Sequence, residues 1–114
     1  MKTRRYDETA AMKNPHGVDA RALYDAPEAT INIIALQPGQ ALKKHVTPVD
    51  VVFYVLEGRG TVEIGEEKQE VGRDTLVESP KMIAHCWYNT GDALLRVMVI
   101  KTPRQAEKTV LTGK

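Results

Sequence analysis

The sequence predicts an all-β domain that closes into a sandwich or a barrel. Short runs rich in β-branched and aromatic residues recur along most of the chain, and Gly, Pro, Asn and Asp separate them at short intervals. No stretch between residues 29 and 103 keeps the period of an amphipathic helix. The chain has 114 residues, of which 42% are hydrophobic and 27% charged, the size and balance of one globular domain. An all-β chain of this size must close or cover its sheet edges, which favours a barrel or a sandwich.

Residues 1–28 are expected to form a polar N-terminal arm with at most one short strand or helical turn. They are rich in charge and are interrupted by Pro15, Gly17 and Pro27. The segment 19–24 is too short to form a stable helix on its own. The arm has no apolar run of the kind found in secretion signals, so we expect no cleaved signal.

The barrel is expected over residues 29–103, because turn residues divide this range into about eight short strands. The first run alternates and ends at Pro38-Gly39, and the strongest run, 51–56, leads into a turn over Glu57–Gly60. Later reversals follow at glycine and proline positions, and the last strand stops before Pro103. The expected strands are 31–35, 41–46, 51–56, 61–64, 68–71, 75–78, 84–88 and 94–101. Residues 104–114 form a polar tail that is expected to fray or to dock on a partner subunit.

Charge and composition exclude several classes of function. Sixteen Lys and Arg against fifteen Asp and Glu leave a net charge of +1, so no strong field draws the chain to nucleic acid or to anionic lipid. The apolar runs are far shorter than the roughly twenty residues that cross a bilayer, so no membrane segment is expected. The single cysteine, Cys86, excludes an intrachain disulfide and favours a reducing compartment, the cytoplasm.

Three histidines are the first candidates for a functional site, because the pKa of an imidazole lies near neutrality. His16 lies in the polar arm and is expected to be a solvated surface residue. His45 ends an expected strand. His85 lies inside another, where strand alternation gives it the same face as Trp87.

Alternation also divides the run 51–56 into two faces. One face carries Val51 and Phe53, and the other carries Tyr54. Either face fits a barrel interior, so the pattern alone leaves open which aromatic ring would stack against a planar ligand there.

The spacing of residues between positions 39 and 58 resembles the first motif of the cupin superfamily, G-x5-H-x-H-x3-E-x6-G. Gly39, His45 and Gly58 match that motif. Thr47 stands where the motif has its second histidine, and Val51 stands where it has its glutamate. The resemblance implies a double-stranded β-helix, or jelly-roll barrel, over roughly residues 29–101.

The second motif of that superfamily, G-x5-P-x-G-x2-H-x3-N, is also present in part. Pro80, His85 and Asn89 stand at its spacing, whereas Asp74 and Met82 replace its two glycines. The glycine normally found at position 82 allows a tight turn before the histidine, so Met82 is expected at the mouth of the pocket, where it would narrow or cap it.

The resemblance also implies a metal site that this chain fills only in part. Metal-dependent cupins hold one ion with two histidines and a glutamate from the first motif and a histidine from the second. Here His45 and His85 remain, and two imidazoles alone should bind a metal poorly. A register slip would be needed to bring Asp50 inward as a further ligand. No cofactor is therefore expected, the alternative being one divalent ion of iron, manganese, nickel or zinc.

The sequence therefore predicts a single-domain cupin that binds or modifies a small molecule inside the barrel. His45 and His85 would act as general base or acid. The expected ligand contacts are Thr47, Val51, Phe53, Tyr54, Met82 and Trp87. Two alternatives remain open, a metal-dependent dioxygenase or isomerase that uses His45 and His85 with waters, and a non-catalytic ligand-sensing module. The resemblance further implies a homodimer in which the arm crosses to the neighbour.

Overall fold

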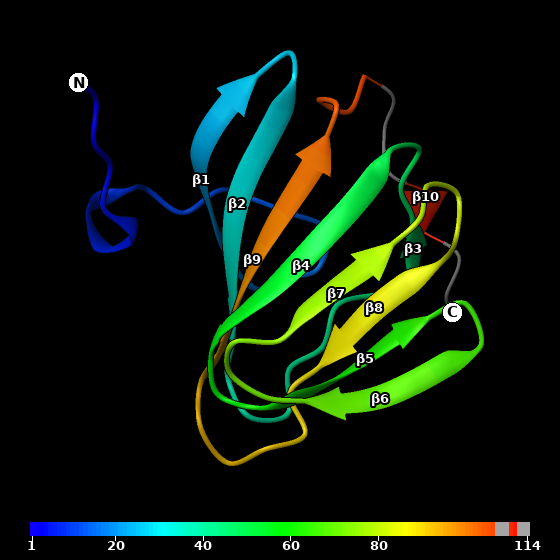
Figure 1. Cartoon of the computed structure of the whole chain (residues 1–114). Helices are drawn as coiled ribbons and strands as arrows, with labels where there is room; N and C mark the ends of the chain where they lie inside the picture. Colours follow the sequence, from blue (N-terminus) through cyan, green and yellow to red (C-terminus); the bar gives the residue numbers. More distant parts are fainter. Residues whose placement is uncertain (107–109, 112–114) are drawn as a thin grey trace.

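The computed structural model describes residues 1–106 and 110–111, and within them ten strands form two five-stranded sheets (Figure 1). The first sheet has the order β1 (Asp19–Ala26), β2 (Ala29–Leu36), β9 (Leu95–Thr102), β4 (Asp50–Glu57) and β7 (Leu76–Ser79). The second has the order β10 (Val110–Leu111), β3 (His45–Val46), β8 (His85–Tyr88), β5 (Gly60–Ile64) and β6 (Glu67–Val71). All the strand pairs in this part of the chain are antiparallel. The predicted all-β jelly-roll fold is confirmed.

Side-chain alternation places the core between the two sheets. On β4 the side chains of Val51, Phe53 and Val55 are buried, while those of Val52 and Tyr54 are not. This settles which face of the run 51–56 points inward. The buried apolar cluster consists of Val18, Ala20, Ile34, Leu36, Leu42, Val51, Phe53, Val55, Val62, Val71, Cys86, Trp87, Leu95 and Val97.

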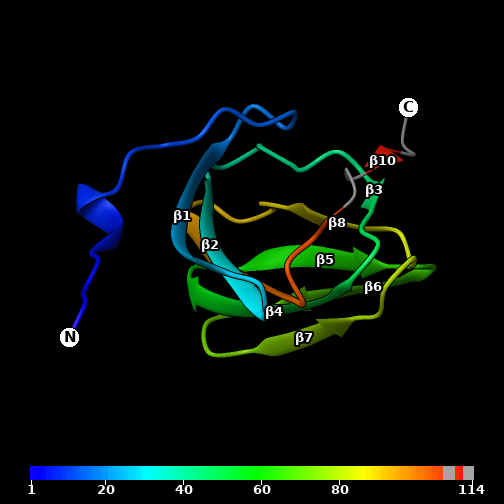
Figure 2. The ribbon, with the colours of Figure 1, turned by 90° about the horizontal axis from the view of Figure 1, so that it is seen from above.

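The strand β1 lies in the second half of the expected arm. It pairs with β2 from Asp19↔Ala35 to Ala26↔Ala29, so Pro27 and Glu28 form the turn of a hairpin. The single strand allowed for the arm is therefore longer than expected and is part of the first sheet. A short 3-10 helix, η1 (Tyr6–Glu8), precedes it, and Figure 2 shows this helix to one side of the barrel, joined to β1 by a looping segment.

The expected strand 41–46 is shorter in the structure, where it is a bridge at Ala41 and the two-residue strand β3. The reason lies in the backbone of Lys43. Its N–H donates to the ring of His16, and its carbonyl contacts the ring of His45, so side chains occupy groups that would otherwise pair with a neighbouring strand. Beyond the expected strands, β10 in the tail pairs with β3.

Gly58, the last residue of the first motif, is at a position that no other residue could occupy without a shift in the backbone. Its φ is +84°, in the left-handed region, and a Cβ atom there would collide with the carbonyl oxygen of Leu94. Within the described residues, no helix is long and apolar enough to cross a membrane.

Candidate functional site

His45 and His85 lie directly opposite each other on the paired strands β3 and β8. Their Nε2 atoms are 3.1 Å apart, and their rings meet edge to face with centroids 4.5 Å apart. Both side chains point into the barrel and are buried, with exposed fractions of 8% and 2%. The structure therefore brings together the two histidines that were expected to form a site.

The neighbours of this pair decide which ring nitrogens carry protons. The Nδ1 atom of His45 lies 2.7 Å from the carbonyl oxygen of Lys43, which can only accept, so this nitrogen is protonated. In a neutral His45 ring, Nε2 is then the acceptor, and the Nε2–H of His85 donates to it. The Nδ1 atom of a neutral His85 must also accept, and Ser79 Oγ donates to it at 2.6 Å. The result is a directed chain from Ser79 through His85 and His45 to the backbone.

Burial keeps the rings of this chain neutral. Desolvation, with smaller contributions from the nearby His45 and Lys101, lowers the pKa of His85 to about 3. The pKa of His45 is also lowered, mainly by burial, although the carbonyl of Lys43 opposes this effect. Both imidazoles are therefore uncharged at neutral pH.

His16 is not the solvated surface residue that its place in the arm suggested, so that prediction is wrong. Its ring is partly buried, with its centroid 4.8 Å from that of His45. Its Nδ1 accepts a hydrogen bond of 2.9 Å from the backbone N–H of Lys43, which leaves the proton of a neutral ring on Nε2. Burial lowers its pKa to about 4. The arm reaches this position because the side chain of Asn14 holds the turn over residues 14–18.

The three rings line a cavity of about 190 Å³ inside the barrel mouth. Its walls are mostly apolar, as in typical small-molecule pockets, but it is smaller than a pocket for a drug-sized ligand. The lining residues are Met12, Asn14, Pro15, His16, Val18, Ala20, Asn32, Ile34, Leu42, His45, Thr47, Val51, Phe53, His85, Val99 and Lys101.

Three of the expected ligand contacts, Thr47, Val51 and Phe53, line this cavity with the histidines. Thr47 Oγ1 lies 3.3 Å from His85 Nε2, close enough to share its proton with His45. The ring of Phe53 meets that of His85 edge to face, with centroids 5.2 Å apart. Around His85, the cavity therefore presents a hydroxyl group and an aromatic ring side by side.

The other expected contacts lie elsewhere. Tyr54 points away from the interior, and its hydroxyl donates to Asp74 at 3.3 Å. Trp87 is fully buried beneath Phe53, outside the lining set, and its Nε1 has no hydrogen-bond partner within the described residues. Met82 is 61% exposed on the surface and does not cap this cavity.

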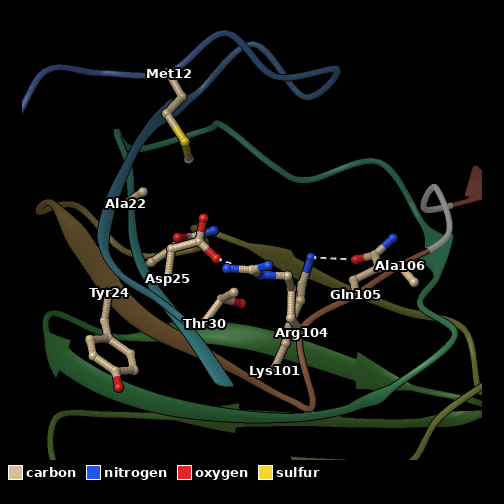
Figure 3. A pocket seen from close by; sticks show the side chains of 10 residues that line it. Met12, Ala22, Tyr24, Asp25, Thr30, Lys101, Arg104, Gln105 and Ala106 are labelled. Carbon is tan, nitrogen blue, oxygen red and sulfur yellow. Dashed lines mark hydrogen bonds and ion pairs between the residues drawn. The ribbon is translucent and has the colours of Figure 1, made fainter. Parts of the chain in front are cut away.

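Sequence reasoning missed Lys101, which also lines the cavity. The signal was present in strand alternation, because Leu95, Val97, Val99 and Lys101 occupy successive inward positions of β9. Lys101 also lines a second, outer pocket of about 420 Å³, shown in Figure 3. The two cavities share Met12, Asn32 and Lys101 and therefore adjoin.

The comparisons with known proteins agree with this architecture. The cupin domain family matches residues 32–101, well over half of the chain. The chain belongs to the cupin family. An uncharacterized protein of Streptomyces coelicolor is 26% identical to this cupin over 106 residues, which are 93% of this chain and 100% of that protein.

Solved structures show the same fold. The protein TT1209 of Thermus thermophilus superimposes on this cupin with a TM-score of 0.78 at 27% identity, over 90% of this chain and 98% of that one. The polyketide cyclase RemF of Streptomyces resistomycificus reaches a TM-score of 0.86 at 18% identity, over 100% and 87% of the two chains. At that identity, the second likeness concerns the fold alone.

This cupin keeps the backbone of the second motif without its glycines. Asp74 and Met82, which replace them, have φ angles of 68° and 66° and are the non-glycine residues with positive φ in the described part of the chain. The left-handed conformation costs an ordinary residue about 1–2 kcal/mol, and Asp tolerates it better than Met. The two turns therefore persist at a local cost in stability.

The metal site of the family does not fit the residues of this chain. Val51 and Thr47, at the positions of the missing ligands, are buried in the cavity wall. Asp50 stays outside, where its carboxylate accepts the backbone N–H of Lys81 at 2.8 Å. The third imidazole, His16, has its Nδ1 lone pair engaged by a backbone N–H and its proton on Nε2. In the described part of the chain, no group of three or more His, Cys, Asp or Glu is placed to hold a metal ion.

Proposed function

We propose that this cupin binds a small organic molecule in the barrel cavity and that His45 and His85 act on it without a resident metal. The observation that carries the proposal is the contact of 3.1 Å between the two Nε2 atoms at the wall of a mostly apolar cavity. Burying two imidazoles costs free energy unless they are hydrogen-bonded, and here a chain of four polar groups orients them. Such an arrangement is suited to a polar ligand group that enters between the rings.

Separation of the two rings would provide complementary groups for proton transfer. When a ligand displaces the contact, His45 Nε2 becomes a free base and His85 Nε2–H becomes a free donor. A carbonyl compound with an acidic C–H bond would lose that proton to His45, and the electron pair of the C–H bond would form an enolate. The enolate oxygen would then accept hydrogen bonds from His85 and from the hydroxyl of Thr47, which lies 3.3 Å from that ring.

The test combines a ligand screen with metal analysis on untagged protein. NMR spectra of imidazole-labelled protein should show that small carbonyl compounds perturb the signals of His45 and His85. The variant His45→Gln should lose the response, and the variant Tyr54→Phe, altered on the outward face of the same barrel, should keep it. Binders that leave both rings unperturbed, or a stoichiometric metal that is lost in His85→Gln, would contradict the proposal.

The same experiment separates the two alternatives. A stoichiometric iron, manganese, nickel or zinc ion would support a metal-dependent dioxygenase or isomerase that uses His45 and His85. Ligand binding with no proton exchange at the substrate carbon would support a non-catalytic ligand-sensing module. The homodimer and the cytoplasmic location also remain proposals. Light scattering should give twice the chain mass of 12.7 kDa.

A further inference from the structure

We infer that the cavity selects a small carboxylate, with Lys101 as the cation that pairs with it. The inference rests on the proposed function, because it names the ligand class of the same cavity. It is carried by the placement of one lysine inside a barrel whose other described lining groups are neutral.

The position of Lys101 in the sheet is unusual for a lysine. Exposed edge strands often carry lysines that prevent pairing with other chains. Strand β9, however, lies in the middle of the first sheet, and Lys101 is paired with Thr30 on one side and with Val51 on the other. Alternation points its side chain to the same inward face as Val97 and Val99. Protection of an edge therefore does not explain this lysine.

Lys101 has no carboxylate partner among the described residues. Its Nζ atom donates to the neutral amide oxygen of Gln105 at 2.8 Å, as Figure 3 shows, and none of the salt bridges in this part of the chain includes it. No Asp or Glu is among the described residues that line the inner cavity. The acidic group of the outer pocket, Asp25, is paired with Arg104 at 2.8 Å.

Within the described chain, the surroundings of the ammonium group therefore lack a compensating negative charge. Burial lowers the pKa of Lys101, and the lysine in turn lowers the pKa values of His16, His45 and His85. A partly buried cation is costly when it has no counter-charge, and it is stabilised by an anion that enters the same site. An anionic ligand would supply that counter-charge.

The geometry favours a monocarboxylate over a phosphate ester. Phosphate sites usually gather several N–H donors or guanidinium groups around a doubly charged anion. Here Lys101 is the charged group among the described residues that line the inner cavity, to which Asn32 adds an amide, and the guanidinium of Arg104 in the outer pocket is already paired with Asp25. Because Lys101 lines both cavities, a carboxylate held there would lie at their junction, and its apolar body would extend toward Phe53 and the two facing histidines.

The experiment compares acids with neutral amides of the same shape. The probes are propionate, pyruvate and benzoate together with propionamide, pyruvamide and benzamide, and dissociation constants are measured by NMR titration at pH 7. At least one acid should bind, and each acid that binds should do so at least about tenfold more tightly than its amide, a difference of about 1.4 kcal/mol. Lys101→Met should abolish this preference. Lys81→Met, which removes an exposed lysine outside both lining sets, should leave it unchanged.

Stability measurements separate a binding role of Lys101 from a structural one. If the lysine serves binding, Lys101→Met should keep or raise the urea midpoint, because it removes a desolvated cation, and Lys101→Arg should retain part of the preference for acids. If the lysine has a structural role, Lys101→Met should lower the urea midpoint. An unchanged preference in Lys101→Met would overturn the inference. Amides that perturb His45 and His85 as strongly as acids do would overturn the inference and leave the proposed function standing. A complete absence of response at both histidines to every probe would contradict both.

Discussion

The strand β8 carries a polar cluster on each of its two faces, and the two clusters are built on opposite principles. On the inner face, His85 joins Ser79, Thr47 and His45 in a chain of neutral groups. On the opposite face, Tyr88 and the buried Cys86 belong to an outer cluster that includes a charged pair. The two clusters are adjacent in the sequence, so the contrast between them arises from their surroundings.

The outer cluster satisfies its own charges. Glu63 pairs with Lys44 at 2.9 Å and accepts the hydroxyl of Tyr88 at 2.8 Å. The hydrogen bonds from Lys44 and Tyr88 lower the pKa of Glu63 to about 2. Cys86 donates to Tyr88 at 3.2 Å, and burial raises the pKa of its thiol, so this cysteine is expected to be unreactive. Nothing in this cluster requires a ligand.

The inner cluster differs because, among the residues that the structure describes, its charge is left unbalanced. Its imidazoles are neutral and hydrogen-bonded, yet they share a cavity with Lys101, whose hydrogen bond goes to a neutral amide. A polar cluster that is complete in itself indicates a structural role, whereas one that holds an uncompensated cation beside a cavity indicates a ligand. This contrast is the physical basis for placing the function inside the barrel.

The largest expected effect comes from placing a carboxylate on the inner face. The two Nε2 atoms are 3.1 Å apart, near the separation of about 3.3 Å between two imidazole nitrogens on a tetrahedral zinc ion. The double variant Thr47→His/Val51→Glu should lose about 3 kcal/mol of unfolding free energy without metal, because Lys101, the cross-strand partner of residue 51, offsets only part of the cost of burying the new carboxylate. Zinc or nickel should restore this stability, as measured by urea unfolding.

The matched control is Val52→Glu, whose side chain lies on the outer face of the same strand. It should lose less stability, and metal should have no effect on it. Equal stabilisation of the wild-type protein by zinc would contradict the conclusion that its own residues do not fit a metal.

The second effect compares one hydroxyl from each cluster. Ser79→Ala leaves the buried Nδ1 of His85 without a donor and should cost about 1–3 kcal/mol in urea unfolding. Tyr88→Phe removes a donor from Glu63, but Lys44 and water can compensate at this partly exposed site, so the loss should be smaller. If Tyr88→Phe lowered the free energy of unfolding as much as Ser79→Ala does, the proposed difference between the two faces would be wrong.

The third effect is a difference in pH dependence. The pKa of His85 falls from an unfolded value near 6.5 to about 3, so between these pH values the unfolded chain binds the extra proton. Stability is therefore complete above pH 6.5 and should fall, by about 1.4 kcal/mol per pH unit for this group, as the pH drops toward 3. The contribution of Glu63, whose folded pKa is about 2, is lost only below about pH 4.3.

Urea unfolding at pH 7.0, 6.0, 5.0, 4.0 and 3.5 measures this window. A loss of stability that begins below pH 6.5 would show that the inner face is responsible. A flat profile down to pH 5, followed by a loss below pH 4.3, would show that the outer cluster dominates instead.

The smallest effect concerns the turn that leads into β8. Met82 adopts a φ of 66° on the surface, and its backbone N–H donates to the carbonyl of Thr47 at 2.9 Å. Met82→Gly should remove the left-handed strain and stabilise the fold by about 1 kcal/mol, with the flexibility of glycine offsetting part of the gain. Thermal unfolding would measure this stabilisation. The control variant Ile83→Gly should instead destabilise the fold.

Much of the architecture could be predicted from the sequence. Turn residues and alternation place the strands from 29 to 103, and the motif spacing brings His45 opposite His85. The hairpin of β1 and β2 was missed because the proline in its turn also fits a loop within a polar arm. Lys101 was readable from alternation, since it continues the inward series of β9.

His16 could not have been placed from local pattern. Its position depends on a hydrogen bond to Lys43, which is 27 residues away in the chain, and on a turn that Asn14 stabilises. Local sequence encodes that turn, but not the part of the barrel on which the arm comes to rest. The sequence also could not show which residues line the pocket, because three-dimensional packing defines its boundaries. For this reason the ligand contacts expected at Tyr54, Met82 and Trp87 were wrong.

The protonation of the three imidazoles tests the central claim most directly. Long-range 1H–15N correlation spectra of untagged, metal-free protein at pH 7 assign the tautomer of each ring. The structure predicts neutral rings, with the proton on Nδ1 of His45 and on Nε2 of both His85 and His16. An imidazolium signal from His85, or an Nδ1–H tautomer of that ring, would contradict the account of the inner face.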